Sequence, residues 1–179
     1  MYSLGTVIVQ DSIIENNFLH TNGGPSAGLV IEFSPNNNRV IDTVFQNNSG
    51  GWAIDSIQVN HDSRAYFDGI TVRNAGGYGM NVSSRENVEI VDSVFESANL
   101  RKFSSSIYSG GTELGALVVS NTEFQNSRLD ILDNDIDLGE IVVSNSSFES
   151  ISSPPSSLIY RHINPPNPPN GGSLLVTQT

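Results

Sequence analysis

The stretch from Gly77 to Phe95 reads GYGMNVSSRENVEIVDSVF, and it decides the fold of this 179-residue chain. Apolar and polar residues alternate before Asp92, and apolar residues return directly after it. Alternation of this kind is typical of half-buried β-strands. An Asp, Asn or Gly between two strands tolerates a positive φ, so it permits a sharp bend. The stretch therefore predicts two short strands joined by a bend at Asp92.

The same pattern recurs along the whole chain. The bend positions are Asp11, Asp42, Gly69, Asp92, Asn121 and Asn145, with a seventh copy cut off after Gln178. The steps between them vary from 23 to 33 residues. Leucine-rich and helical repeats hold a tighter period, and no sustained helical periodicity is present. Irregular steps with a constant apolar pattern favour a solenoid whose loops differ in length.

The apolar positions of the repeat predict two ladders inside such a solenoid, with rungs about 4.8 Å apart. One ladder consists of Ile14, Phe45, Val72, Phe95, Phe124 and Phe148. The other consists of Val9, Val40, Phe67, Ile90, Val119, Val143 and Val176.

A third strand is predicted in each coil, often after a glycine. Its positions are residues 28–31, 51–54, 79–82, 106–108, 129–131 and 158–160, and the longest loops are predicted at 16–27, 56–66 and 98–106. Three strands per coil indicate an all-β, right-handed parallel β-helix of about seven coils. The alternative is a β-sandwich, but a sandwich does not require the same residue types at the same place in every repeat.

Residues 77–95 resemble the consensus coil of the pectin-lyase-like right-handed β-helix superfamily. The resemblance implies the fold and leaves the activity open, because that superfamily includes lyases, hydrolases, epimerases, phage tailspikes and adhesins. The Asn-Thr-Asp, Gly-His-Gly and Arg-Ile-Lys motifs of polygalacturonases are absent, as is the Asp-Pro-His element of alginate epimerases. No family activity is therefore carried over to a residue of this chain.

The repeat spans residues 1–179, which predicts a single domain with a proline-rich loop at 152–172. Neither end of the repeat has a visible cap, and an uncapped solenoid end invites edge-to-edge association. We therefore expect the chain to be part of a larger protein or assembly, with a protein partner at the coil ends or a glycan as its ligand.

The net charge of the chain limits the classes of partner that it can bind. Eight basic residues, with Lys102 as the single lysine, face nineteen acidic ones, for a net charge of −11. Such a surface repels nucleic acid, anionic membranes and, without bridging metal ions, uronide polymers. No apolar run is long enough to span a bilayer, no signal peptide is visible, and cysteine is absent. Richness in Asn, Ser and Gly predicts an extracellular or cell-surface location.

Three kinds of site are candidates. Glu32 and Asp55, on neighbouring predicted strands, are the carboxylates that a carbohydrate-active enzyme would use, with Arg39, Arg64 or Arg85 as charge stabilisers. Asp133, Asp135 and Asp137 form an acidic run that predicts a solvated turn, with a calcium site as the alternative, and no other cofactor is expected. Glycosylation sequons begin at Asn47, Asn81 and Asn145.

The sequence supports two candidate functions. The leading one is a non-catalytic structural or binding β-helix that contacts a glycan or a protein. The alternative is a polysaccharide lyase or glycoside hydrolase, or a fragment of one, acting in a groove beside the strands that begin at Gly28, Gly51 and Gly79.

Overall fold

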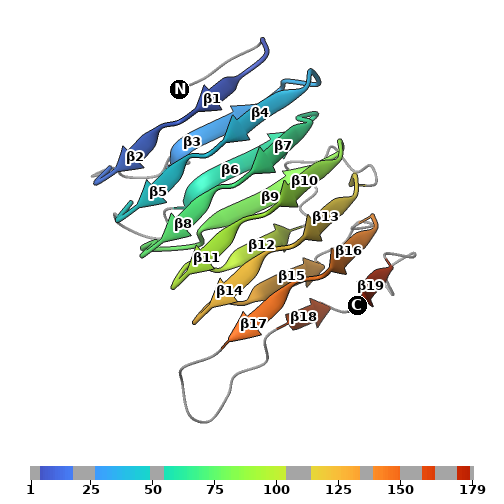
Figure 1. Ribbon diagram of the computed structural model, residues 1–179. Helices are drawn as coiled ribbons and strands as arrows, with labels where there is room; N and C mark the ends of the chain where they lie inside the picture. The colour runs from blue at the N-terminus through green and yellow to red at the C-terminus, as the bar shows by residue number, and fades with distance from the viewer. Residues whose placement is uncertain are drawn as a thin grey trace.

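The computed structural model is a parallel β-solenoid, which confirms the predicted fold class. The structure describes residues 5–17, 27–48, 55–103, 114–133, 139–149, 159–163 and 173–177. All the strand pairs in this part of the chain are parallel, and none of its residues lies in a helix. Figure 1 shows the coils stacked from the N-terminus to the C-terminus, so that each strand lies beside its equivalent in the next coil.

The described strands form three sheets. Sheet 1 contains β1 (Ile8–Gln10), β4 (Asn38–Ile41), β7 (Ala65–Asp68), β10 (Val88–Val91), β13 (Leu117–Ser120), β16 (Ile141–Ser144) and β19 (Leu174–Thr177). Sheet 2 contains β2 (Ile13–Glu15), β5 (Val44–Gln46), β8 (Thr71–Arg73), β11 (Val94–Glu96), β14 (Glu123–Gln125) and β17 (Ser147–Glu149). Sheet 3 contains β3 (Ala27–Glu32), β6 (Asp55–His61), β9 (Met80–Ser84), β12 (Leu100–Phe103), β15 (Leu129–Asp133) and β18 (Ile159–Ile163).

Sheet 1 has seven strands in the described part of the chain, whereas sheets 2 and 3 have six each. The described strands therefore complete six coils and begin a seventh with β19, where about seven coils were predicted. Strand β18 lies within the predicted proline-rich loop at 152–172, and the rest of that segment lies outside the described residues.

The register of both predicted ladders is confirmed residue by residue, and their side chains are buried between the end coils. In sheet 1, Val40 pairs with Phe67 and Phe67 with Ile90, and all three side chains have no solvent exposure. In sheet 2, the rings of Phe95 and Phe124 stack with centroids 5.2 Å apart. Equivalent apolar side chains thus lie directly above one another, which removes nearly all of their surface from water.

The six predicted bends between sheets 1 and 2 all have a positive φ. The angles are 48° at Asp11, 45° at Asp42, 63° at Gly69, 48° at Asp92, 49° at Asn121 and 47° at Asn145. In five coils the next residue is Ser or Thr, and its hydroxyl donates a hydrogen bond to the backbone carbonyl two residues earlier. These residues are Ser12, Thr43, Ser93, Thr122 and Ser146. Each bend therefore combines a left-handed residue with a hydroxyl that satisfies a backbone group.

Two strands of sheet 3 lie where loops were predicted. Strand β6 occupies Asp55–His61, mostly within the loop predicted at 56–66, and β12 occupies Leu100–Phe103, within the loop predicted at 98–106. Strand β12 was missed because Lys102 takes the interior position that is apolar in neighbouring coils. Residues 51–54 and 106–108 themselves lie outside the described residues.

The end coils keep large apolar side chains in contact with water. Ile8 and Ile13 in the first coil are 68% and 66% exposed. Val176 continues the ladder of Val143, yet it is 53% exposed whereas Val143 is 1% exposed. Within the described residues no further coil covers either end.

Candidate functional site

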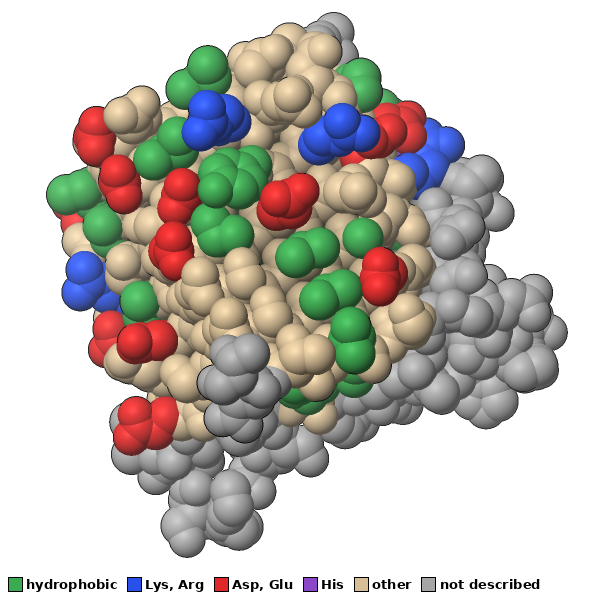
Figure 2. Space-filling view, turned by 45° about the vertical axis from the view of Figure 1, so that its right-hand side comes forward, with side chains coloured by type: hydrophobic (Ala, Val, Ile, Leu, Met, Phe, Trp, Pro, Cys, Tyr) green, Lys and Arg blue, Asp and Glu red, His purple; other side chains and the backbone are tan. Residues whose placement is uncertain are grey.

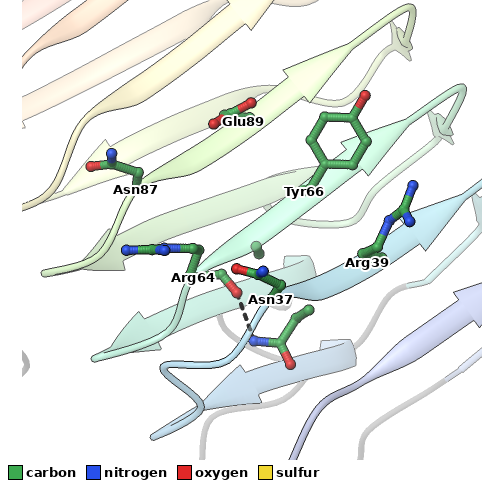
Figure 3. A pocket seen from close by; sticks show the side chains of 8 residues that line it. Asn37, Arg39, Arg64, Tyr66, Asn87 and Glu89 are labelled. Carbon is green, nitrogen blue, oxygen red and sulfur yellow. Dashed lines mark hydrogen bonds between the residues drawn. The ribbon is translucent and has the colours of Figure 1, made fainter.

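The described residues form a shallow groove on the outer face of sheet 1. It encloses about 350 Å³ and lies at the start of three neighbouring strands, β4, β7 and β10. Its lining consists of Asn37, Asn38, Arg39, Arg64, Ala65, Tyr66, Asn87 and Glu89 (Figure 3). The volume falls within the range of small-molecule and cofactor sites.

One row of side chains crosses this groove. Arg39, Tyr66 and Glu89 occupy the same register position in β4, β7 and β10, so their backbones are spaced by about 4.8 Å per coil. Each lies between two inward-facing residues of its own strand, and strand alternation therefore directs it outward. Figure 3 shows the three side chains on neighbouring strands. The core pattern thus fixes a cation, an aromatic ring and an anion in a line, which we call the Arg39–Tyr66–Glu89 row.

Tyr66 is at the centre of the row and is held from two sides. The Arg39 guanidinium carbon lies 5.7 Å from the centre of the Tyr66 ring, within the range of a cation–π contact. The Tyr66 hydroxyl lies 3.3 Å from Oδ2 of Asp68, to which it donates a hydrogen bond. Partial burial, followed by the negative charge of Asp68, raises the pKa of Tyr66. The phenol therefore stays protonated at neutral pH, with a lone pair left to accept from a ligand.

Asn38 forms the rigid wall of the groove. Its side chain has no solvent exposure, and Oδ1 accepts hydrogen bonds from the Val7 amide and the Ser34 hydroxyl. Its Nδ2 donates toward the carbonyls of Ser34, Asn36 and Arg64. One buried amide thereby connects the first three coils beneath the groove.

The remaining charges at this corner are paired between coils. Nη2 of Arg64 lies 2.8 Å from Oε2 of Glu86, and Arg85 forms an ion pair with Asp62. Arg39 and Glu89 have no ion pair within the described residues. Figure 2 brings the right-hand side of Figure 1 forward, where sheet 1 lies, and shows acidic and hydrophobic side chains mixed on this face, with basic ones near the top and at the left edge.

A second cluster lies at the carboxyl ends of β3 and β6. Nε2 of His61 lies 3.1 Å from Oε1 of Glu32, and both side chains are largely buried. The Phe33 ring stacks on the His61 ring with centroids 4.1 Å apart. Phe33 and His61 both have a positive φ, 51° and 57°, which is strained for residues of this bulk.

The two predicted catalytic carboxylates belong to residues at opposite ends of neighbouring strands. Glu32 ends β3 and pairs with Asn60, whereas Asp55 begins β6, five residues before Asn60. The two backbones are therefore displaced by about 16 Å along the strands. Glu32 lies beside His61, and the groove that the described residues form lies on sheet 1.

The predicted calcium and glycosylation sites stay predictions. Asp133 ends β15, its side chain is not among those described, and residues 135 and 137 lie outside the described part of the chain. No group of three or more metal-ligating side chains occurs among the described residues.

Of the sequon asparagines, Asn47 and Asn145 are exposed bend residues with a positive φ. Asn81 lies within β9 and is only partly exposed. No helix in the described part of the chain is long and apolar enough to cross a membrane.

Sequence reasoning missed the Arg39–Tyr66–Glu89 row, although Arg39 and Arg64 were named as charge stabilisers. A signal was present, because each member of the row directly precedes a residue of the sheet 1 ladder, namely Val40, Phe67 and Ile90. Aligning the repeats on that ladder would have placed the three side chains in register.

The arrangement defines a class of protein: a parallel β-solenoid with a shallow polar groove across its coils. No family model, no curated protein and no solved structure matches the chain.

Proposed function

We propose that the chain is a non-catalytic binding β-helix and that its ligand is a glycan held in the groove of sheet 1. The observation that carries the proposal is the Arg39–Tyr66–Glu89 row. A sugar ring has an apolar face that packs on an aromatic ring, and hydroxyls that both donate and accept hydrogen bonds. The row offers one aromatic face flanked by a donor group and an acceptor group.

The non-catalytic part of the proposal rests on the carboxylates. Glycoside hydrolysis typically uses two carboxyl groups that face each other across the sugar. Glu89 is the one carboxylate among the described lining residues, while nearby Glu86 is paired with Arg64. The groove therefore offers recognition chemistry without a described acid–base pair.

An enzyme remains the second candidate, and the Glu32–His61 contact is the observation that favours it. A carboxylate that orients a histidine is a recurrent arrangement in general acid–base catalysis. A release of reducing or unsaturated sugar ends by the wild-type protein, lost in His61→Gln, would support this candidate. Turnover that persists in His61→Gln would place any chemistry elsewhere.

The wider setting is also part of the proposal. The resemblance of residues 77–95 supports a proposed relation to the pectin-lyase-like superfamily, and the acidic, asparagine-rich composition supports a proposed extracellular location. Val176 is at an interior ladder position and is nevertheless 53% exposed, which supports a protein surface that covers the last coil. Light scattering over a concentration series, with Val176→Thr as the variant, tests this: association that this change leaves intact would contradict it.

The decisive experiment is a glycan array followed by calorimetry on the strongest binder. Tyr66→Ala removes the stacking surface and is expected to abolish binding, whereas Tyr66→Phe keeps the ring and is expected to retain most of it. Arg73→Gln, in β8 of sheet 2, is the control for charge loss outside the groove. Glycan binding that is unchanged in Tyr66→Ala, or no binding to any glycan, would contradict the proposal.

A further inference from the structure

We propose that the groove selects uncharged glycans and that Glu89 is the residue that excludes oligosaccharides carrying carboxylates on successive sugars. This inference rests on the proposed glycan binding and names the class of ligand.

The first step is the balance of charge in the groove. Arg64 is already neutralised by Glu86, at 2.8 Å. Arg39 and Glu89 are then the two lining charges without an ion pair in the described part of the chain, and they flank Tyr66 on either side. The lining is therefore close to neutral overall, in contrast to the net charge of −11 of the whole chain.

The second step is geometric. Two coil spacings separate the backbones of Arg39 and Glu89 by about 10 Å. A sugar ring that packs on Tyr66 lies between them, so that substituents on its two sides come near opposite charges. Arginine can only donate hydrogen bonds and an ionised carboxylate can only accept them. A hydroxyl does both, so a neutral sugar satisfies the two ends of the row in either orientation.

The third step is the fate of a carboxylated sugar. Its carboxylate could pair with Arg39, but the rest of a short acidic oligosaccharide would bring its next carboxylate toward Glu89. Like charges at this range repel, and the surrounding acidic surface adds repulsion that salt screens beyond about 8 Å. Asp68, hydrogen-bonded to the Tyr66 hydroxyl, adds a further negative charge beside the ring.

The test uses matched pairs of oligosaccharides that differ only in charge, such as an oligogalacturonide and its fully methyl-esterified form, together with glucose–glucuronate and mannose–mannuronate pairs on an array. Wild-type protein is expected to bind neutral members at least tenfold more tightly than their carboxylated partners. Its affinity for the neutral members should change less than about twofold with added salt, since no counterions are released.

Glu89→Gln is expected to raise the affinity for carboxylated members about tenfold and to leave that for neutral members within about threefold. Glu96→Gln, an exposed residue of β11 in sheet 2, changes the net charge equally and is the control. An equal effect of both variants would overturn the role of Glu89.

The two proposals fail in different ways. Tyr66-dependent binding with no preference within the pairs, or with a preference for carboxylated members, would overturn this inference and leave glycan binding standing. Absence of Tyr66-dependent binding to every member would overturn both.

Discussion

Lys102 donates a hydrogen bond from its Nζ to the carbonyl oxygen of Gly115, from a side chain that has no solvent exposure. It lies in β12 at an interior position, where the paired residues of the neighbouring coils are Val82 and Ile131. Burial lowers the pKa of Lys102 from 10.5 to about 7. The single lysine of the chain therefore replaces one rung of an apolar ladder.

The first prediction concerns the pH dependence of stability. Between about pH 7 and 10.5 the unfolded chain binds a proton at Lys102 that the folded chain does not, so this group makes the free energy of unfolding rise with pH by up to about 1.4 kcal/mol per pH unit. Below about pH 7 both states are protonated, and the full cost of burying the charge, on the order of 5 kcal/mol, is present.

Lys102→Met removes that cost and leaves the Gly115 carbonyl without this donor, a loss of about 1 kcal/mol. The variant is expected to be more stable than wild type at pH 6–7, with the difference shrinking toward pH 9.5. Urea unfolding of both proteins across this range measures it. A difference that stays constant with pH would contradict the lowered pKa.

The second prediction concerns the aromatic ladder of sheet 2. Phe124 is 1% exposed and lies between Phe95 and Phe148, whose ring centroids are 5.2 and 4.5 Å away. Phe124→Ala is expected to lower the free energy of unfolding by about 3–5 kcal/mol, since it leaves a cavity between two rings. Phe148→Ala is the matched comparison. It is expected to cost less, because Phe148 is only partly buried in the last strand of that sheet. If urea unfolding shows the same loss of free energy for both variants, packing of a ring on each side of Phe124 does not add to its stability.

The third prediction concerns a surface bend. Asn121 is exposed, yet its φ is 49°. Asn121→Val is expected to lower the free energy of unfolding by about 1–2 kcal/mol, because a β-branched residue is strained in the left-handed region. Asn121→Gly should change it by less than about 0.5 kcal/mol, since glycine adopts this conformation freely. Thermal unfolding that ranks the two variants the other way would show that the side chain matters more than the backbone angle.

The fourth prediction concerns Asn38, the buried amide under the groove. Asn38→Ala removes its hydrogen bonds to three coils and is expected to cost about 3 kcal/mol in the free energy of unfolding. Its exposed neighbour provides the control, since Asn37→Ala is expected to stay within about 0.5 kcal/mol of wild type. Chemical unfolding compares them, and a cost for Asn38→Ala no larger than for Asn37→Ala would refute the connecting role.

The backbone repeat could be predicted closely because it depends on local chemistry. Bend residues such as Asp92 and Asn121 are needed for their φ, and ladder residues such as Phe67 for their volume, so both signals recur at fixed places. Sheet 3 was harder to predict, because Lys102 breaks the apolar alternation of β12 at an interior position.

The groove could not be predicted in the same way. Its members lie in different coils, and the steps of 27 and 23 residues that separate Arg39, Tyr66 and Glu89 carry no signal until the register is known. The contact of Glu32 with His61 has the same origin, because it also depends on the register between β3 and β6.

The register of sheet 1 has a consequence for how such a surface can change. The row that holds Arg39, Tyr66 and Glu89 continues through Val118 and Val142, one side chain per coil. Each of these outward side chains can be substituted without changing the interior ladder of the same sheet, because the spacing between coils stays the same. The solenoid thus separates the interior residues needed for folding from the outward residues that are free to vary for recognition. A longer ligand could be accommodated by substitutions in one further coil at a time.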